Sequence, residues 1–159
     1  MTYRQRMLAV LKGEESDRIP FCPRMDLWYI ANRSRGTLPG GMEGMNTVEI
    51  ARELDVGCHA IDADFTLQAP PESHQIRVFG FENHPDFPYR VELEDLPVEF
   101  EIKGDRYVTR ITTNAGVLTT HMRYTEEMPH NGISTPFIDT YPIQSVDDLK
   151  AVSEVLESQ

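Results

Sequence analysis

The stretch from residue 98 to residue 124 restricts the fold most strongly, because its side chains alternate along three successive β-rich runs. Val98, Phe100 and Ile102 alternate with the acidic residues Glu99 and Glu101. Lys103-Gly104-Asp105 and Asn114-Ala115-Gly116 have the composition of tight turns, and they separate this run from 106–113 and 117–124. The pattern predicts an antiparallel meander with one polar face. We expect Phe100, Ile102, Val108 and Val117, or their immediate strand neighbours, to pack on the other face.

The first 65 residues have a different rhythm. Thr2 to Gln5 forms a capping-box pattern that predicts a helix over 3–12, with Gly13 after its end. Asn46 and Glu49 predict a second capped helix over 47–54, ended by Gly57. Apolar runs at 21–23 and 58–65 follow the two helices and predict strands. Helices that alternate with strands in this way indicate a parallel sheet.

The remaining segments are predicted to be mostly loops. Residues 27–46 are rich in glycine and aromatic residues and indicate a long loop, with one helical turn over 27–32. Residues 66–97 are rich in proline and 125–141 form a further loop. Ser145 is the expected cap of a last helix, with Leu149, Val152 and Leu156 as its apolar stripe.

Charge and composition exclude several classes of protein. The net charge is −11 and the basic residues are scattered, so no basic surface for nucleic acid is expected. No apolar run is long enough to cross a bilayer, and the first residues lack the features of a signal peptide. Cys22 and Cys58 make no disulfide framework, which favours a reducing cytoplasm. Neither cysteine lies in a zinc-binding pattern, so no metal site is predicted within this chain.

Three stretches resemble the uroporphyrinogen-decarboxylase-like superfamily in their order and spacing. The opening MTYRQRMLAVLKGEESDRIPF is similar to the family's first helix and the Asp-Arg-hydrophobic-Pro entry to its first strand. ELDVGCHAIDADF resembles the second helix-to-strand junction, and YPIQSVDDLKAV resembles the start of a later helix. The meander is similar to an insertion in the branch that contains corrinoid-dependent methyltransferases. The decarboxylases' Arg-Gln-Ala-Gly-Arg loop is replaced here by residues 23–29, so the methyltransferase branch is the closer one.

The resemblance implies a particular fold class: α/β, the amino-terminal part of a TIM-type (β/α)8 barrel that carries an inserted β meander. On this interpretation residues 1–65 begin the barrel, 66–130 form the loop and meander insertion, and 131–159 form a return helix. A barrel of this type needs about 250 residues, so the chain is expected to be incomplete as a barrel. We therefore expect an oligomer, or a second chain that completes the structure.

The resemblance also indicates candidate site residues. Asp64 aligns with an aspartate that the family places at the end of its second strand, where it accepts hydrogen bonds from substrate. Arg24 and Asp26 follow the predicted first strand, at the end where barrel enzymes place their chemistry. We take Asp64 and Asp26 as candidate catalytic residues and Arg24 as a candidate substrate-binding residue. A solvated loop pair is the alternative for Arg24 and Asp26, and a loop cap is the alternative for Asp64.

Other side chains of the same region complete the set. Trp28 and Tyr29 are candidate walls of a substrate pocket, with ordinary packing as the alternative. Asp62 shares a predicted strand face with Asp64, and such a pair of carboxylates can transfer a proton. Cys58 and His59 are neighbours on that strand and are expected to point to opposite faces, so His59 is interpreted as structural.

Three functions follow from the resemblance. The first is methyl transfer between a small methylated substrate and a corrinoid protein, with zinc bound by residues outside this chain. The second is a tetrapyrrole decarboxylase-like reaction that needs no cofactor. The third is a non-catalytic binding or assembly module. No cofactor is expected to bind to this chain alone.

Overall fold

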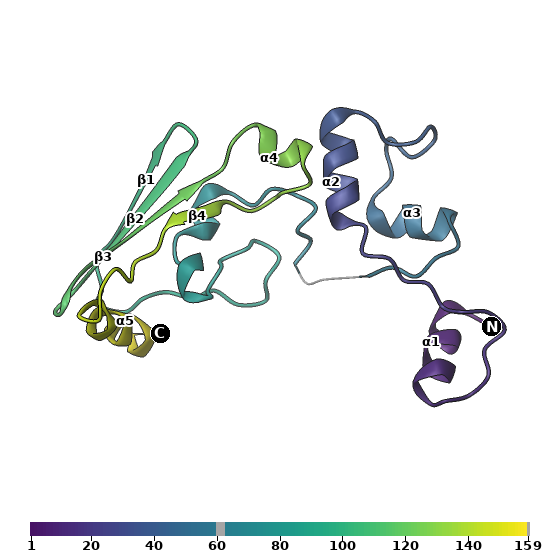
Figure 1. Cartoon of the computed structure of the whole chain (residues 1–159), viewed down its shortest axis with the longest axis horizontal. Coiled ribbons are helices and arrows are strands. Elements are labelled where there is room, and N and C mark those ends of the chain that lie inside the picture. The colour runs from purple at the N-terminus through teal and green to yellow at the C-terminus, as the bar shows by residue number, and fades with distance from the viewer. Residues whose placement is uncertain (60–62, 159) are drawn as a thin grey trace.

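The computed structural model describes residues 1–59 and 63–158. Three helices come first: α1 (Tyr3–Leu11), α2 (Asp26–Arg35) and α3 (Thr47–Glu53). The later part carries two 3₁₀ turns, four strands and two helices. In chain order these are η1 (Pro71–His74), η2 (Arg77–Phe79), β1 (Val98–Lys103), β2 (Arg106–Thr113), β3 (Gly116–Arg123), α4 (Glu127–His130), β4 (Phe137–Thr140) and α5 (Asp148–Glu157) (Figure 1).

Local hydrogen bonds define α1 and α3 as the capping patterns predict. The Thr2 hydroxyl accepts from the Gln5 amide, and the Gln5 side chain accepts from the Thr2 amide. Asn46 and Glu49 form the same reciprocal pair at the start of α3. Helix α3 ends at Glu53, one residue before the predicted end at residue 54. The prediction that Gly57 ends it is wrong, because Asp55 takes the left-handed conformation there, at φ 49°. Gly57 has another role: a side chain there would meet the Tyr3 ring and lie 2.9 Å from Cys22 Cβ.

Helix α2 occupies the first half of the stretch 27–46, where a loop with one helical turn over 27–32 was predicted. Asp26 stands in its first turn and arginines in its last, which suits the helix dipole at both ends. Gly36 ends the helix at φ +68°, a conformation that glycine adopts readily. Tyr29 and Ile30 are its buried residues. The glycines led to the prediction of a loop over residues 27–46, but all of them lie after residue 35, in the second half of that stretch.

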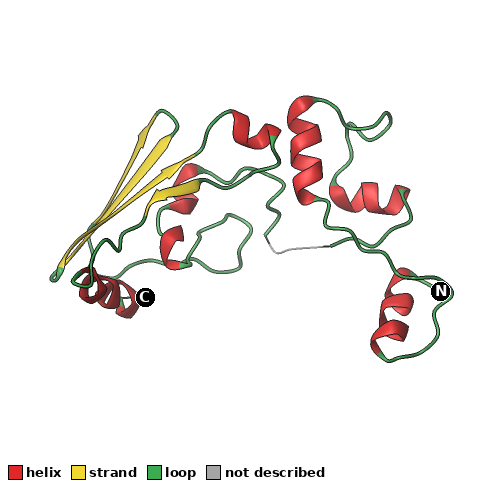
Figure 2. Ribbon diagram, in the orientation of Figure 1, coloured by secondary structure: helices red, strands yellow, loops and turns green. Residues whose placement is uncertain are grey.

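The predicted meander is confirmed, and a fourth strand joins it. The sheet has the order β1-β2-β3-β4 and is antiparallel throughout (Figure 2). β4 lies in the segment 125–141, which was predicted to be a loop. Its four residues are too few to show an alternating pattern in the sequence, so pairing with β3 identifies the strand.

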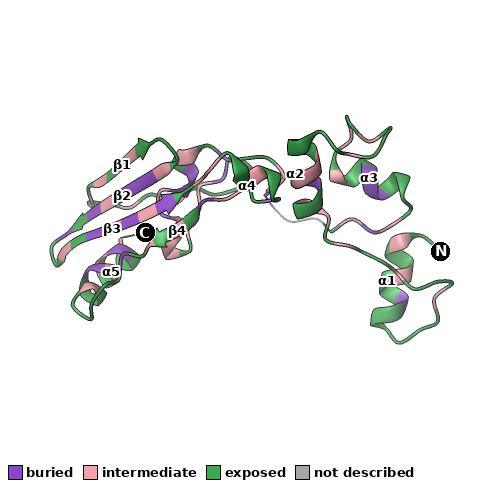
Figure 3. Cartoon of the chain, turned by 45° about the horizontal axis from the view of Figure 1, so that its top comes forward, coloured by how far each residue is buried: buried purple, intermediate pink, exposed green. Residues whose placement is uncertain are grey.

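One face of this sheet forms the core of the larger half of the molecule. The register aligns Phe100, Thr109 and Thr120 across three strands on the covered face. Val108 and Val117 lie on the opposite face, and Val117 is 56 % exposed. Val108 is nevertheless buried, at 5 % exposed, so only Val117 is wrong as a packing residue. On the covered face the strand neighbours Thr109 and Leu118 are buried, as the prediction allowed. Figure 3 shows the buried residues concentrated on β2 and β3.

Helix α5 and the loop before β1 cover this face. Ile111 and Leu118 of the sheet pack with Ile76, and with Ala151 and Val155 of α5. Val152 packs against this cluster as predicted, but Leu149 and Leu156 are each 50 % exposed. Ser145 was predicted to cap α5 with its side chain. Instead, the Asp148 carboxylate accepts a hydrogen bond from the Ser145 backbone amide at 2.7 Å.

The prediction of a (β/α)8-barrel portion is wrong. Every strand in the described part of the chain belongs to the one antiparallel sheet. Residues 21–23 and the described residues near 58–65 are outside strands, and one hydrogen bond from the Gly57 amide to the Phe21 carbonyl joins the two segments at 2.8 Å. Prolines 20 and 23 flank the first segment, which leaves little backbone free to pair.

The molecule is elongated, with α1 to α3 at one end and the sheet with α5 at the other (Figure 1). The two ends meet where α2 packs against α4. Gly132, at φ +81°, follows α4 and lies against the Leu27 carbonyl. None of the described helices has the length and apolarity that a bilayer-spanning helix needs.

Candidate functional site

A cavity of about 180 Å³ lies where the amino-terminal ends of α2 and α3 meet the segment around residue 64. Asp26 is the first residue of α2, and Thr47 is the first of α3. The described residues that line the cavity are Pro23, Met25, Asp26, Thr47, Val48, Cys58, His59, Ala63, Asp64, Phe65 and Thr66. The structure therefore brings together Asp26 and Asp64, the two candidate catalytic residues.

Arg24 holds the Asp26 carboxylate in place. Its Nε donates to Oδ1 at 2.8 Å and its Nη2 donates to Oδ2 at 2.8 Å. The hydrogen bond from Arg24 is the main cause of a lowered pKa for Asp26, and it outweighs the opposing effect of burial. Asp26 is therefore ionised at neutral pH. The Arg24 side chain is 59 % exposed and does not line the cavity, so it positions Asp26 rather than contacting a ligand there.

Asp64 is oriented by its own loop. Its Oδ1 accepts from the Thr66 amide at 3.0 Å and from the Thr66 hydroxyl at 2.6 Å. This is the side-chain-to-backbone turn that Asp commonly forms, and it matches the alternative of a loop cap. Oδ2 has no hydrogen-bond partner within residues 1–59 and 63–158. The loop thus fixes one oxygen and leaves the other available in the cavity wall.

Cys58 and His59 both line the same cavity, contrary to their predicted orientation. Side chains of adjacent residues point apart only in an extended strand, and neither residue lies in one. Cys58 is a free, half-buried thiol and His59 is exposed. The sequence prediction missed these two side chains because it took residues 58–65 as a strand.

The remaining candidates lie elsewhere. Tyr29 is only 6 % exposed, and Arg33 lies over its ring at 5.9 Å. Trp28 is 38 % exposed. Neither lines the cavity within the described part of the chain, and packing within α2 is the better interpretation of Tyr29. Asp62 lies outside the described residues.

The cavity has the charge of an acidic site. Its described lining carries the two carboxylates and no lysine or arginine. The described residues contain no group of three or more His, Cys, Asp or Glu side chains placed to hold a metal ion. The zinc that the family resemblance implies would be bound by residues outside this chain, so the cavity is interpreted without a metal ion.

Comparisons with protein families, curated proteins and solved structures found no match to this chain. The resemblance to the uroporphyrinogen-decarboxylase-like superfamily thus remains a prediction from the three sequence stretches. The geometry of the cavity is the independent observation on which a function can be argued.

Proposed function

We propose that the cavity beside Asp26 and Asp64 binds a small methylated cation. The observation that carries this proposal is the lining itself, in which two carboxylates face a small space without a lysine or arginine among the described residues. Arg24 neutralises part of the Asp26 charge, which leaves Asp64 as the main partner for a cation. Opposite charges attract more strongly in such a recess than in bulk water.

The apolar part of the lining suits methyl groups. Phe65, Met25 and Val48 contribute to the walls together with Pro23. An aromatic ring beside carboxylates is a common way to bind a methylated ammonium group, because the ring face attracts the cation while the methyl groups remove apolar surface from water. A volume of about 180 Å³ admits a molecule of only a few heavy atoms.

Methyl transfer to a corrinoid protein is the reaction that we propose for this substrate. It is supported by the sequence resemblance to the corrinoid-dependent branch, and the antiparallel fold lends it no support. In this proposal the chain's own residues bind and orient the substrate: Asp64 pairs with the cation, while Asp26, held by Arg24, maintains the negative wall. A decarboxylase acting on a substrate with many carboxylates is disfavoured by the same acidic lining.

A further polypeptide is part of the proposal. The chain exposes 10134 Å², about 2,000 Å² more than expected for a compact monomer of 18.2 kDa. An ordinary interface buries roughly 800 Å² on each partner, so the excess corresponds to the larger, obligate class. We propose that a second chain covers this surface, in a reducing compartment such as the cytoplasm where Cys22 and Cys58 stay free.

Binding is tested by titrating the full chain with tetramethylammonium and following amide shifts by two-dimensional NMR. We expect saturable shifts around the cavity, and about tenfold weaker binding in Asp64→Asn, which keeps size and removes charge. Asp147→Asn is the control, since Asp147 is the N-cap residue of α5 and makes no side-chain cap bond. Neopentyl alcohol, a neutral molecule of similar shape with one additional hydroxyl group, is expected not to bind.

Two results would contradict the proposal. Equal affinity for the cation and the neutral alcohol would show that charge does not contribute to binding. Equal affinity of Asp64→Asn and Asp147→Asn for the cation would show that Asp64 does not contribute. Methyl transfer is tested separately, by adding a corrinoid acceptor to the full chain with its partner. Cation binding without any transfer would favour the non-catalytic binding module.

A further inference from the structure

We infer that a second cavity, separate from the acidic one, binds a small aromatic molecule that carries both an ammonium and a carboxylate group. This cavity has a volume of about 550 Å³, which is within the range of small-molecule sites. It lies between η1 and the loop that precedes β1. Its described lining residues are Glu72, Ser73, Gln75, Asn83, His84, Pro85, Phe87, Pro88, Tyr89 and Arg90.

His84 is a buried polar residue of this wall. The residue is 6 % exposed, and its Nδ1 accepts a hydrogen bond from the Asp86 amide at 3.2 Å. Because Nδ1 is the acceptor, the ring proton of the neutral imidazole is on Nε2. Nε2 is buried and has no hydrogen-bond partner within residues 1–59 and 63–158. Because this atom has almost no accessible surface, the ring contributes shape to the wall and leaves hydrogen bonding of a ligand to the exposed residues beside it.

Aromatic side chains form a platform beside this histidine. The rings of Phe65 and Phe87 lie 5.3 Å and 5.8 Å from the His84 ring, which fixes its orientation. Tyr89 stacks on Phe87 at 5.0 Å with the ring planes only 10° apart, yet Tyr89 remains 55 % exposed. An exposed ring that is already oriented by stacking offers its free surface to another ring at little entropic cost.

Two opposite charges in the lining define the polar groups of the ligand. Glu72 and Arg90 are both exposed residues of the cavity wall. Arg90 lies 3.3 Å from Glu92, but both side chains are about three-quarters exposed, and such surface pairs are easily replaced. A ligand with an ammonium group for Glu72 and a carboxylate for Arg90 matches this set.

The wall is also held rigidly before any ligand binds. The Asn83 side chain donates to the Val91 carbonyl at 2.9 Å and accepts from the Val91 amide at 2.8 Å. The Asn83 backbone amide donates to the Ser73 backbone carbonyl at 3.0 Å, which joins the loop to η1. These bonds close the loop that carries Phe87, Tyr89 and Arg90, so the cost of ordering it on binding is already met.

L-Phenylalanine is the probe, and two analogues isolate its charged groups. 3-Phenylpropionate lacks the ammonium group, and phenethylamine lacks the carboxylate. We expect L-phenylalanine to shift the amides of residues 83–90 saturably in NMR titrations of the full chain, and to bind more tightly than either analogue.

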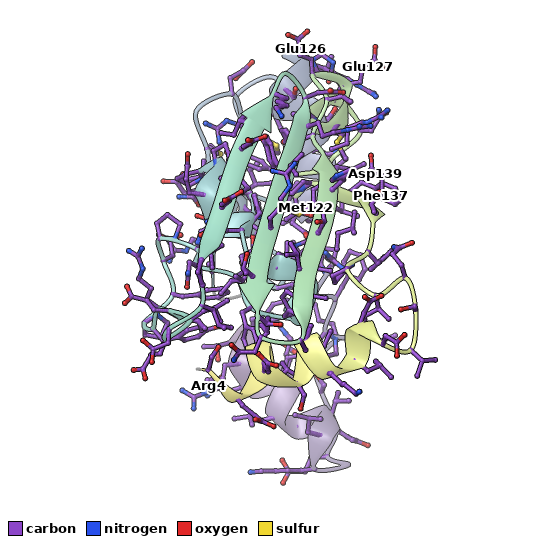
Figure 4. The ribbon with its side chains drawn as sticks, turned by 90° about the vertical axis from the view of Figure 1, so that its left-hand side faces the viewer. Arg4, Met122, Glu126, Glu127, Phe137 and Asp139 are labelled. Carbon is purple, nitrogen blue, oxygen red and sulfur yellow. The ribbon has the colours of Figure 1, made fainter. Side chains whose placement is uncertain are left out.

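Variants at exposed positions then test each contact without threatening the fold. Arg90→Gln is expected to weaken L-phenylalanine about tenfold and to leave phenethylamine unchanged. Glu72→Gln is expected to weaken phenethylamine and leave 3-phenylpropionate unchanged. Arg4→Gln is the control, on α1 at the far end of the molecule and labelled in Figure 4. The inference is overturned if L-phenylalanine gives no saturable shifts, or if Arg90→Gln and Arg4→Gln bind it equally.

Discussion

Asp26 is held ionised by Arg24, its neighbour two positions earlier in the chain. Three distances of 2.8 to 3.1 Å join the two side chains, and the carboxylate also stands at the start of α2. A negative charge in the first turn of a helix is stabilised by the unpaired amides there. At the scale of single residues, a short-range ion pair thus serves both the helix and the cavity.

Replacement of Asp26 by Asn is expected to lower the free energy of unfolding by up to about 1 kcal/mol at pH 7, since Arg24 is largely exposed. The pKa of Asp26 is below its ordinary value of 3.8, so its contribution is present above that pH and is lost as the pH falls below it. Urea unfolding at pH 7 and pH 3 measures this. A difference between wild type and variant that is as large at pH 3 as at pH 7 would contradict it.

The sheet shows how a strand register decides burial at the scale of elements. Figure 4 looks onto the sheet and labels Met122 on β3, with Phe137 and Asp139 on β4 beside it. Met122 is 0 % exposed, whereas Val117 on the same strand is 56 % exposed. The two residues are five positions apart, an odd number, so they lie on opposite faces.

Truncation of these two side chains is expected to have very different costs. Met122→Ala removes buried methylene groups and is expected to lower the free energy of unfolding by about 2–5 kcal/mol. Val117→Ala changes an exposed position and is expected to alter it by less than about 0.5 kcal/mol. Thermal or urea denaturation of both variants provides the comparison. Similar losses from the two would show that β3 does not present the faces described.

At the scale of the whole molecule, a narrow contact joins the two ends. Gly132 lies against the Leu27 carbonyl, and a side chain at this glycine would be 3.0 Å from the Leu27 carbonyl carbon. Arg35 of α2 donates to the Asn131 side chain at 3.3 Å. Close approach of two backbones thus fixes the junction of α2 with α4.

Gly132→Ala is expected to destabilise the protein by about 2–5 kcal/mol, because it combines an unfavourable φ with a steric overlap. Gly104→Ala is the matched control, since Gly104 also has positive φ but no atom within 4 Å of its added carbon. That variant is expected to lose only about 1–2 kcal/mol. Equal unfolding free energies for the two would mean that the Leu27 contact adds nothing.

Exposed apolar residues at the α1 end predict self-association or a partner. Leu11, Ile19 and Phe21 are 77 %, 89 % and 63 % exposed. Light scattering coupled to size exclusion is expected to give a mass above 18.2 kDa for the isolated chain. The double variant Ile19→Lys, Phe21→Ser is expected to shift it toward the monomer mass. A monodisperse wild-type monomer at high concentration would contradict this prediction.

The sequence by itself determined the features that depend on neighbouring residues. The two capping boxes, at Thr2 and Asn46, need only side chains three positions apart. The meander from Val98 to Arg123 needs only alternation and two tight turns. Such interactions are local, so the residues that make them can be read from one short stretch.

Tertiary structure alone decided which segments meet. Asp26 and Asp64 were each singled out in the sequence, but only the fold places them around one cavity and adds Cys58 and His59. The register of β2 and β3 turned Val117 outward, and pairing with β3 made a strand of residues 137–140. The prediction of a barrel was wrong for the same reason. The partner of a strand depends on contacts between residues that are distant in the sequence. An apolar run such as 58–65 carries no information about that partner.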